Sequence, residues 1–219
     1  MTALYTRRGP DAATPPPDWT PVLSLRHERL APIGIEPVEP DVDPATYAEV
    51  YRLARQIREA GHRGLGFVPA DDETPVTTLA VQLTLALADA TSEKVALFDA
   101  NIHDSRLRPV HRPDDAHRDG FATCWLDERS AIIVSVIASP VGARSMPKIE
   151  AAIARARAGF GWVLVDFSRM EALGEHRRAY DLVEGVVLVA RAGKTRDKAL
   201  VRRQRELPPE RDLGVLLVG

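Results

Sequence analysis

From residue 43 onward, short uninterrupted runs of apolar residues alternate with stretches whose apolar residues recur every three or four positions. The uninterrupted runs are typical of parallel strands buried on both faces, and the recurrence is typical of helices. The expected strands lie at residues 64–68, 94–98, 131–137, 162–165, 185–190 and 213–218. The expected helices lie at residues 44–60, 76–90, 147–158, 171–182 and 195–207. This alternation predicts an α/β fold with a doubly wound, mostly parallel sheet flanked by helices.

The predicted domain begins at residue 44. Asp43 is a suitable N-cap, Pro44 suits the first helical position, and Gly61 ends the helix. The first 44 residues hold nine of the 17 prolines, which disfavour regular helix and central strand. We therefore expect residues 1–43 to be a Pro-rich flexible segment, from which a short apolar piece between residues 19 and 30 could dock, and residues 44–219 to be the domain.

Length and charge exclude several classes of protein. A chain of 219 residues suits one domain with a tail, and its net charge of -2 gives no electrostatic bias toward nucleic acid. The single cysteine, Cys124, cannot form an intrachain disulfide. The apolar runs are too short to span a bilayer, and no apolar segment follows the charged N-terminus as a secretory signal would require. These features predict a cytoplasmic protein without a transmembrane segment.

The loop after the first expected strand stands where an α/β protein of this kind binds phosphate. A phosphate-binding loop needs glycines for its backbone N–H groups, a lysine for the β- and γ-phosphates and a hydroxyl for Mg²⁺. Here Val76 stands in the place of the lysine, Pro75 replaces the last glycine, and only Thr77 keeps the hydroxyl. The degenerate loop consists of Ala70, Asp71, Asp72, Glu73, Thr74, Pro75, Val76 and Thr77.

The acidic residues of this loop would repel a polyphosphate. Two like charges about 4 Å apart cost roughly 1 kcal/mol even in water. We therefore expect no cofactor, and ATP with Mg²⁺ belongs only to an alternative interpretation. The loop by itself would also suit an unrelated α/β protein.

Other segments carry a resemblance to a known family. Glu49, Arg52 and Arg55 lie three residues apart on the first expected helix, so they share one face. The spacing resembles the Glu-x-x-Arg-x-x-Arg pattern of bacterial tyrosine kinases of capsule and exopolysaccharide synthesis, which are P-loop ATPases. In that family the pattern joins subunits into a ring, so the resemblance implies that these three residues form a subunit contact.

Further segments in the same order strengthen the resemblance. Asp99 fits the first aspartate of the family's second Walker motif, with Asn101 in place of the second, and Asp166 fits the Walker B aspartate. Phe167 then begins a segment that departs from the family's Thr-Pro-Pro. Residues 182–195 resemble the penultimate strand and the loop after it. The Gly-Lys-Thr at 193–195 is no P-loop, because Leu188 stands where its first glycine would be.

The resemblance implies a P-loop NTPase-like domain, and the damaged loop implies a pseudokinase. The hypothesis is a non-catalytic regulator or scaffold of exopolysaccharide or capsule synthesis that binds a membrane polysaccharide co-polymerase or a related kinase as a homo- or hetero-oligomer. One alternative is an active ATPase or tyrosine kinase with an unorthodox site that uses Thr77, Asp99 and Asp166. Another is a positioning scaffold similar to MinD and ParA, which share the fold.

Three further sets of side chains are interpreted as non-catalytic. His103, His111 and His117 share a polar, acidic segment, but their spacing matches no standard metal site, so we expect no metal. Cys124 is expected to be a small buried residue. Basic residues form helix faces that are typical of solvated surfaces, although an acidic partner or a lipid surface could contact them. These residues are Arg155, Arg157, Arg202, Arg203 and Arg205.

Overall fold

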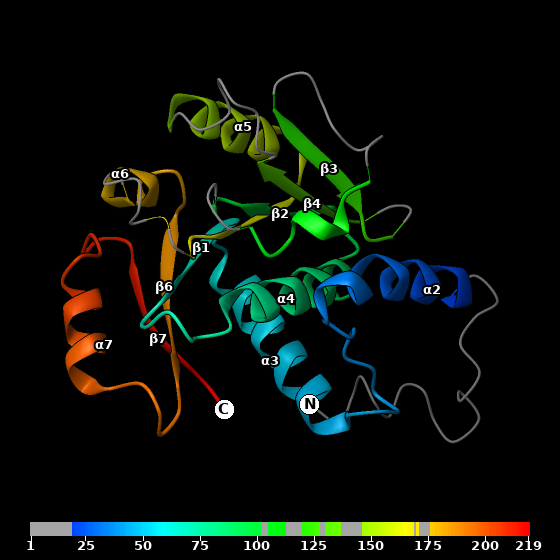
Figure 1. Ribbon diagram of the computed structural model, residues 1–219, viewed down its shortest axis with the longest axis horizontal. Coiled ribbons are helices and arrows are strands. Elements are labelled where there is room, and N and C mark those ends of the chain that lie inside the picture. The colour runs from blue at the N-terminus through cyan, green and yellow to red at the C-terminus, as the bar shows by residue number, and fades with distance from the viewer. Residues whose placement is uncertain are drawn as a thin grey trace.

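The computed structural model describes residues 19–101, 105–112, 120–127, 130–136, 146–168, 170 and 176–219, with only the backbone of residues 19–24. One seven-stranded sheet runs through the molecule, and helices cover both of its faces (Figure 1). This is the predicted α/β architecture of a P-loop NTPase-like domain.

The sheet has the strand order β3-β4-β2-β5-β1-β6-β7. Six strands are parallel, and only β3 at one edge runs antiparallel to its neighbour β4. The strands are β1 (Gly64–Pro69), β2 (Val95–Asp99), β3 (Phe121–Trp125), β4 (Ala131–Val136), β5 (Trp162–Asp166), β6 (Gly185–Arg191) and β7 (Asp212–Val218). Because β1, β2 and β5 are adjacent and parallel, their carboxyl ends open at the same edge of the sheet.

Two apolar cores separate the helices into two layers. One core joins the sheet to α2 (Trp19–Leu30), α3 (Pro44–Ala60) and α4 (Val76–Thr91). The other core joins the opposite face to α5 (Met146–Gly159), α6 (His176–Tyr180) and α7 (Asp197–Gln204). Two short 3-10 helices, η1 (Ala31–Ile33) and η2 (Arg108–Val110), lie in the connections. Figure 1 shows α6 and α7 beside β6 and β7, away from α2 and α3.

The central strands are buried along their whole length because both faces of the sheet are covered. Every residue of β1, β2 and β5 is buried. Gly66 in β1 is needed for the close approach of Phe167, since a Cβ atom there would lie 2.2 Å from the phenyl ring. Phe167 therefore packs over β1 and brings the end of β5 against the start of the loop after β1.

The six strands predicted from apolar runs are confirmed within a few residues, and β3 was missed. It lies in a segment rich in charge, and it pairs with β4 at an edge where alternate residues are less buried. Four of the five expected helices correspond to α3, α4, α5 and α7. The fifth, expected at residues 171–182, is represented by α6, and residues 171–175 lie outside the described part of the chain.

In the second half of the segment expected to be flexible, the structure shows the docking that the sequence left open. Residues 19–43 include α2 and pack on the domain, with Leu30 fully buried. The buried guanidinium of Arg26 pairs with Asp89 at 2.9 Å and Asp127 at 3.0 Å, and Tyr51 donates to Asp89 at 2.7 Å. The helix thus docks through the buried Leu30 and through one arginine held between two carboxylates. Residues 1–18 lie outside the described part.

Among the helices of the described residues, none combines the length and the apolar character required to cross a bilayer.

Candidate functional site

The candidate site lies where the carboxyl ends of β1, β2 and β5 meet. The loop of residues 70–77 follows β1, Asp99 ends β2, and Asp166 ends β5. The parallel register pairs Asp99 directly with Asp166. The sheet therefore brings together the three pieces that the sequence associated with nucleotide binding.

Backbone donors of the loop after β1 are bound inside the protein. Ala70 N–H donates to the Val189 carbonyl at 2.8 Å, and Thr74 N–H donates to the Asp71 carbonyl at 3.1 Å. Val76 N–H donates to the Thr74 carbonyl at 2.9 Å. Pro75 has no N–H to donate. A phosphate cradle works through free backbone N–H groups, and these positions do not provide them.

The Asp71 carboxylate accepts hydrogen bonds from three further donors. It accepts from Glu73 N–H at 3.2 Å, from the Thr74 hydroxyl at 2.9 Å and from the Thr195 hydroxyl at 2.6 Å. Partial burial raises the pKa of Asp71, but the hydrogen bonds from Thr195 and Thr74 and the charge of Arg191 outweigh it and hold the pKa below its ordinary value. The carboxylate is thus the anion that this loop binds.

Arg191, at the end of β6, neutralises the loop from the other side. Its guanidinium lies 2.7 Å from the Glu73 carboxylate and 3.4 Å from the Asp71 carboxylate. The Thr195 hydroxyl also accepts from Arg191 N–H at 2.9 Å. The third acidic residue, Asp72, is exposed. Two of the three carboxylates that were expected to repel phosphate therefore have a cation of the same chain.

The position of the missing lysine faces the core. Val76 is 1% exposed and belongs to the apolar core between the sheet, α3 and α4. The hollow beside it has a volume of about 30 Å³ and is bounded by the loop, Asn101, Arg106 and Ser168. Such a volume holds one or two water molecules and is far below the several hundred Å³ of a cofactor site.

Thr77 and Asp166 form one buried pair. The Thr77 hydroxyl donates to the Asp166 carboxylate at 2.6 Å, and Ser168 N–H donates to the same carboxylate at 2.8 Å. Asp166 is 1% exposed. The hydroxyl that a P-loop offers to Mg²⁺ is here a donor to the Walker B-like aspartate.

Asp99 is equally buried, and it faces Asp166 across the two strands. Asn101 N–H donates to its carboxylate at 2.9 Å, and the Ser105 hydroxyl also donates to it. Burial first, and then the negative charge of Asp166, raise the pKa of Asp99 to about 7, and burial also raises the pKa of Asp166. The pair therefore keeps a proton to a higher pH than an exposed aspartate would, because two adjacent buried negative charges are unfavourable.

The site was tested for its fit to a divalent cation with a triphosphate. The oxygen atoms of Thr77, Asp99 and Asp166 are of the type that Mg²⁺ prefers. The described residues contain no cluster of three or more His, Cys, Asp or Glu that could hold a metal ion. For a triphosphate, the N–H groups of Ala70, Thr74 and Val76 already have acceptors, and the hollow is small.

The expected subunit-contact residues lie together on the outer side of α3. The opposite side of α3 buries Tyr51, Ala54 and Ile57. Arg52 pairs with Glu49 at 2.7 Å within the helix, and both side chains are largely exposed. No ion pair joins Arg55 to another residue of the described chain. The face is therefore available for contact.

The remaining sequence candidates divide between described and undescribed residues. Cys124 is buried, as predicted, and forms no disulfide bond within the described residues. His103 and His117 lie outside the described part of the chain, so the histidine segment is not tested as a group. Sequence reasoning missed the roles of Ser105 and Arg106, which follow β2 in an irregular segment without a motif. It placed Arg191 and Thr195 in a family loop but did not foresee that they bind Asp71.

Comparison with known proteins rests on structure alone. No protein-family model matches the sequence, and a search of curated proteins found no match. Solved structures with a similar fold include the tyrosine kinase domain of BceF, with 15% identity, a TM-score of 0.64, and coverage of 90% of this chain and 87% of that domain. The kinase domain of the Escherichia coli tyrosine kinase ETK has 17% identity and a TM-score of 0.65, with 84% of this chain and 80% of that one covered.

The chimerical protein CapA2B2 is similar over 88% of this chain and 97% of its own, with 12% identity and a TM-score of 0.66. The similarity covers nearly the whole of each structure, while the identities are too low to transfer an activity. The chain therefore has the fold of the bacterial tyrosine kinase domains.

Proposed function

We propose that this chain is a non-catalytic, kinase-like regulator or scaffold of exopolysaccharide or capsule synthesis. The proposal is supported most by one observation, the Asp71 carboxylate that accepts hydrogen bonds from its own loop and from Thr195. A loop that is neutralised by its own side chain has little free energy to gain from a phosphate. The fold remains as a rigid support for contacts with other proteins.

The proposed contact is the α3 face that carries Glu49, Arg52 and Arg55. The partner would be a membrane polysaccharide co-polymerase or a related kinase, in a homo- or hetero-oligomer. Arg52 and Glu49 satisfy each other within the helix, whereas Arg55 has no ion-pair partner in the described chain. Arg55 is therefore the residue of this face with most to gain from a carboxylate on a second subunit.

The first test is calorimetric titration of the whole chain with ATP and with ADP in the presence of Mg²⁺. The proposal predicts no saturable heat at millimolar nucleotide, because loop donors are already bound. Saturable binding that is lost in Asp166→Asn would contradict the proposal and would require an assay of phosphoryl transfer. Denaturation curves of both proteins serve as the control that Asp166→Asn is folded.

A second test addresses assembly separately. The mass of the wild-type chain and of a Glu49→Ala/Arg52→Ala double variant would be measured by sedimentation at several concentrations. The proposal expects a wild-type oligomer that dissociates in the double variant. Lys94→Ala is the control. Lys94 is exposed and lies just before β2, away from the α3 face, so this variant should retain the oligomer. An unchanged mass in the double variant would show that this face is not the contact.

The alternative is an active ATPase or kinase with an unorthodox site. It is favoured by Arg106, which borders the small hollow with Thr77 and whose positive charge acts on Asp166. Arg106 could serve as the missing cation if the loop after β1 opened. The same calorimetry separates the alternative from the main proposal, since only an opened site binds Mg²⁺ with ATP, and Arg106→Gln should then weaken that binding.

A further inference from the structure

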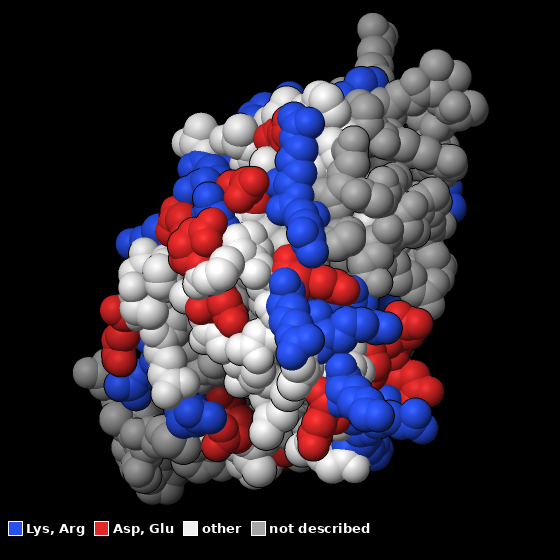
Figure 2. Space-filling view, turned by 90° about the vertical axis from the view of Figure 1, so that its left-hand side faces the viewer, with Lys and Arg blue, Asp and Glu red and all other residues white. Residues whose placement is uncertain are grey.

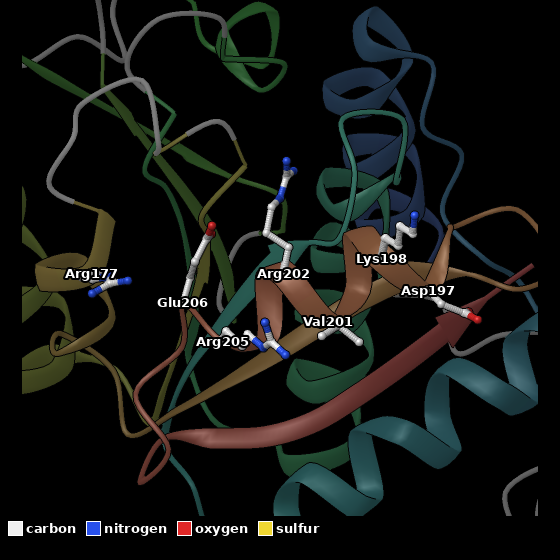
Figure 3. A pocket seen from close by; sticks show the side chains of 7 residues that line it. All are labelled: Arg177, Asp197, Lys198, Val201, Arg202, Arg205 and Glu206. Carbon is white, nitrogen blue, oxygen red and sulfur yellow. The ribbon is translucent and has the colours of Figure 1, made fainter.

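An open groove of about 560 Å³ lies between α6 and α7, on the face of the sheet opposite α3. Four basic residues line it, namely Arg177 from α6 and Lys198, Arg202 and Arg205 from α7 and its end. In Figure 3 these side chains extend from the two helices around the hollow. Figure 2, which faces this side of the molecule, shows Lys and Arg side chains gathered over it with acidic residues alongside.

The basic side chains of α7 share one exposed face of the helix. Lys198, Arg202 and Arg205 are spaced by four and three residues, which places them on one side over about two turns. The opposite side carries Arg203, which is 3% exposed, and Leu207, which is buried in the core. The sheet therefore holds α7 by one side and presents the basic side outward.

None of the four cations has a carboxylate partner within the described residues, whereas their sequence neighbours do. Arg178, next to Arg177, pairs with Glu150 at 2.7 Å. Arg203, next to Arg202, pairs with Glu206 at 2.9 Å. Four cations and only two carboxylates line the groove, so its lining carries a net positive charge that an incoming anion would relieve.

We propose that the groove between α6 and α7 binds a short acidic segment of a partner protein. This surface is separate from the α3 face of the proposed function and lies on the other side of the sheet, so both could be occupied at once. The occupant is recognised by its carboxylates, each of which Arg can bind through two parallel hydrogen bonds.

The dimensions of the groove set the length of the occupant. The span from Lys198 to Arg205 is about 10 Å at 1.5 Å per helical residue. An extended peptide covers that distance with about three residues. Val201 lies between the cations and is 44% exposed, so it offers an apolar contact in the centre of the groove. The groove therefore fits a segment of three to five residues with two or three carboxylates and one apolar side chain.

Two carboxylates at the borders of the groove favour a short peptide over a broad polyanion. Asp197 lies at the first residue of α7, and Glu206 lies beyond its last residue. Figure 3 shows them at opposite ends of the helix. A planar anionic membrane or a nucleic-acid duplex would meet both of these negative charges, whereas a short segment would lie between them.

The test is the fluorescence anisotropy of a labelled ten-residue peptide that alternates Glu pairs with single Leu residues, titrated with the whole chain at 50 mM and 150 mM salt. The proposal expects saturable binding that weakens at the higher salt concentration. A peptide with Gln in place of Glu should not bind. The Lys198→Glu/Arg202→Glu double variant should bind about tenfold more weakly or worse.

Lys94→Glu/Arg108→Glu is the matched control, because it makes the same change in net charge at exposed positions away from the groove. It should retain binding within about twofold. Equal losses in the two double variants, or no binding of the Glu peptide, would overturn the proposal. Tighter binding to vesicles containing phosphatidylserine or to duplex DNA, with the same dependence on Lys198 and Arg202, would overturn the assignment to a peptide.

Discussion

Two charged regions of this molecule differ in how their charges are satisfied. At the carboxyl ends of β1 and β5, Asp71 and Asp166 accept hydrogen bonds from side chains and backbone of the same chain. On the outer side of α7, Lys198 and Arg202 have no carboxylate partner among the described residues. Internally satisfied charges contribute to the stability of one conformation, while unsatisfied exposed charges are free to bind. The difference teaches that charges at the strand ends are bound within this chain, whereas those on the outer side of α7 are left for an external partner.

The largest expected effect concerns the proton held by the Asp99 and Asp166 pair. Burial and the charge of Asp166 raise the pKa of Asp99 to about 7, and an unfolded aspartate titrates near pH 4. The folded chain thus keeps a proton that the unfolded chain releases. This contribution to stability is complete below about pH 4 and is lost as the pH rises toward 7, at about 1.4 kcal/mol per unit of pKa difference.

Urea unfolding at several pH values between 4 and 8 measures this dependence. Asp99→Asn should remove most of the decline, because the amide carries no charge at any of these pH values. The exposed Asp72→Asn is the control and should keep the wild-type decline. A wild-type stability that rises across the whole of this range would show that the pair is ionised in the folded state.

The next largest effect is a difference in the free energy of unfolding between variants of two adjacent arginines of α7. Arg203 is buried, donates to the Pro69 carbonyl at 3.2 Å and pairs with Glu206. Arg203→Met should lower the free energy of unfolding by about 3 kcal/mol, because it leaves buried polar partners unsatisfied. Arg202→Met, on the exposed side, should change it by less than about 0.5 kcal/mol. Denaturant unfolding of the two variants checks the comparison, and equal losses would show that exposure does not separate these two positions.

Much of the fold could be predicted because its determinants are local. Continuous apolar runs gave six of the strands, and Asp43 caps α3 as the sequence predicted, by accepting from Thr46 N–H. What could not be predicted depends on residues far apart in the chain. The helix α2 docks through Arg26 on Asp89 and Asp127, which follow it by 63 and 101 residues.

The candidate site was predictable in its residues but not in its contacts. The strand ends place Asp99 beside Asp166 in any parallel sheet of this order, so the motif alone locates them. The acidic loop was predicted only to repel phosphate. Its partner Thr195 is 124 positions away, and the Asp71 hydrogen bond to it depends on how β6 ends beside β1. Contacts of this kind are visible only once the strands are assembled.

A smaller effect is expected from removing the Asp71 carboxylate, which accepts hydrogen bonds within the loop after β1. Asp71→Ala leaves the donors on Thr74, Thr195 and Glu73 N–H without an acceptor and should cost about 1–2 kcal/mol. The freed donors should accept an added anion, so 50 mM phosphate should raise the melting temperature of Asp71→Ala by more than that of the wild type. The measurement is thermal unfolding with and without phosphate at constant ionic strength.

The neighbouring Asp72→Ala provides the control for Asp71→Ala. Asp72 is exposed and makes no hydrogen bond through its side chain in the described chain, so its removal should change neither the stability nor the response to phosphate. If phosphate raises the melting temperature equally in both variants, the Asp71 carboxylate does not block an anion site in the loop. A response that is restricted to Asp71→Ala would strengthen the contrast between the satisfied loop and the unsatisfied helix surface.

The smallest effect is expected on the outer side of α3. The Glu49 and Arg52 pair is exposed, and such pairs contribute about 0.5 kcal/mol or less, so Arg52→Ala should leave the unfolding free energy nearly unchanged. Arg55→Ala should be similarly neutral in a dilute monomer. If the α3 face joins subunits, both variants should instead lower the melting temperature more at high protein concentration, where the wild-type oligomer is populated. Differential scanning calorimetry over a hundredfold range of protein concentration separates these two behaviours. If the melting temperatures of wild type and variants depend on concentration in the same way, the α3 face does not join subunits.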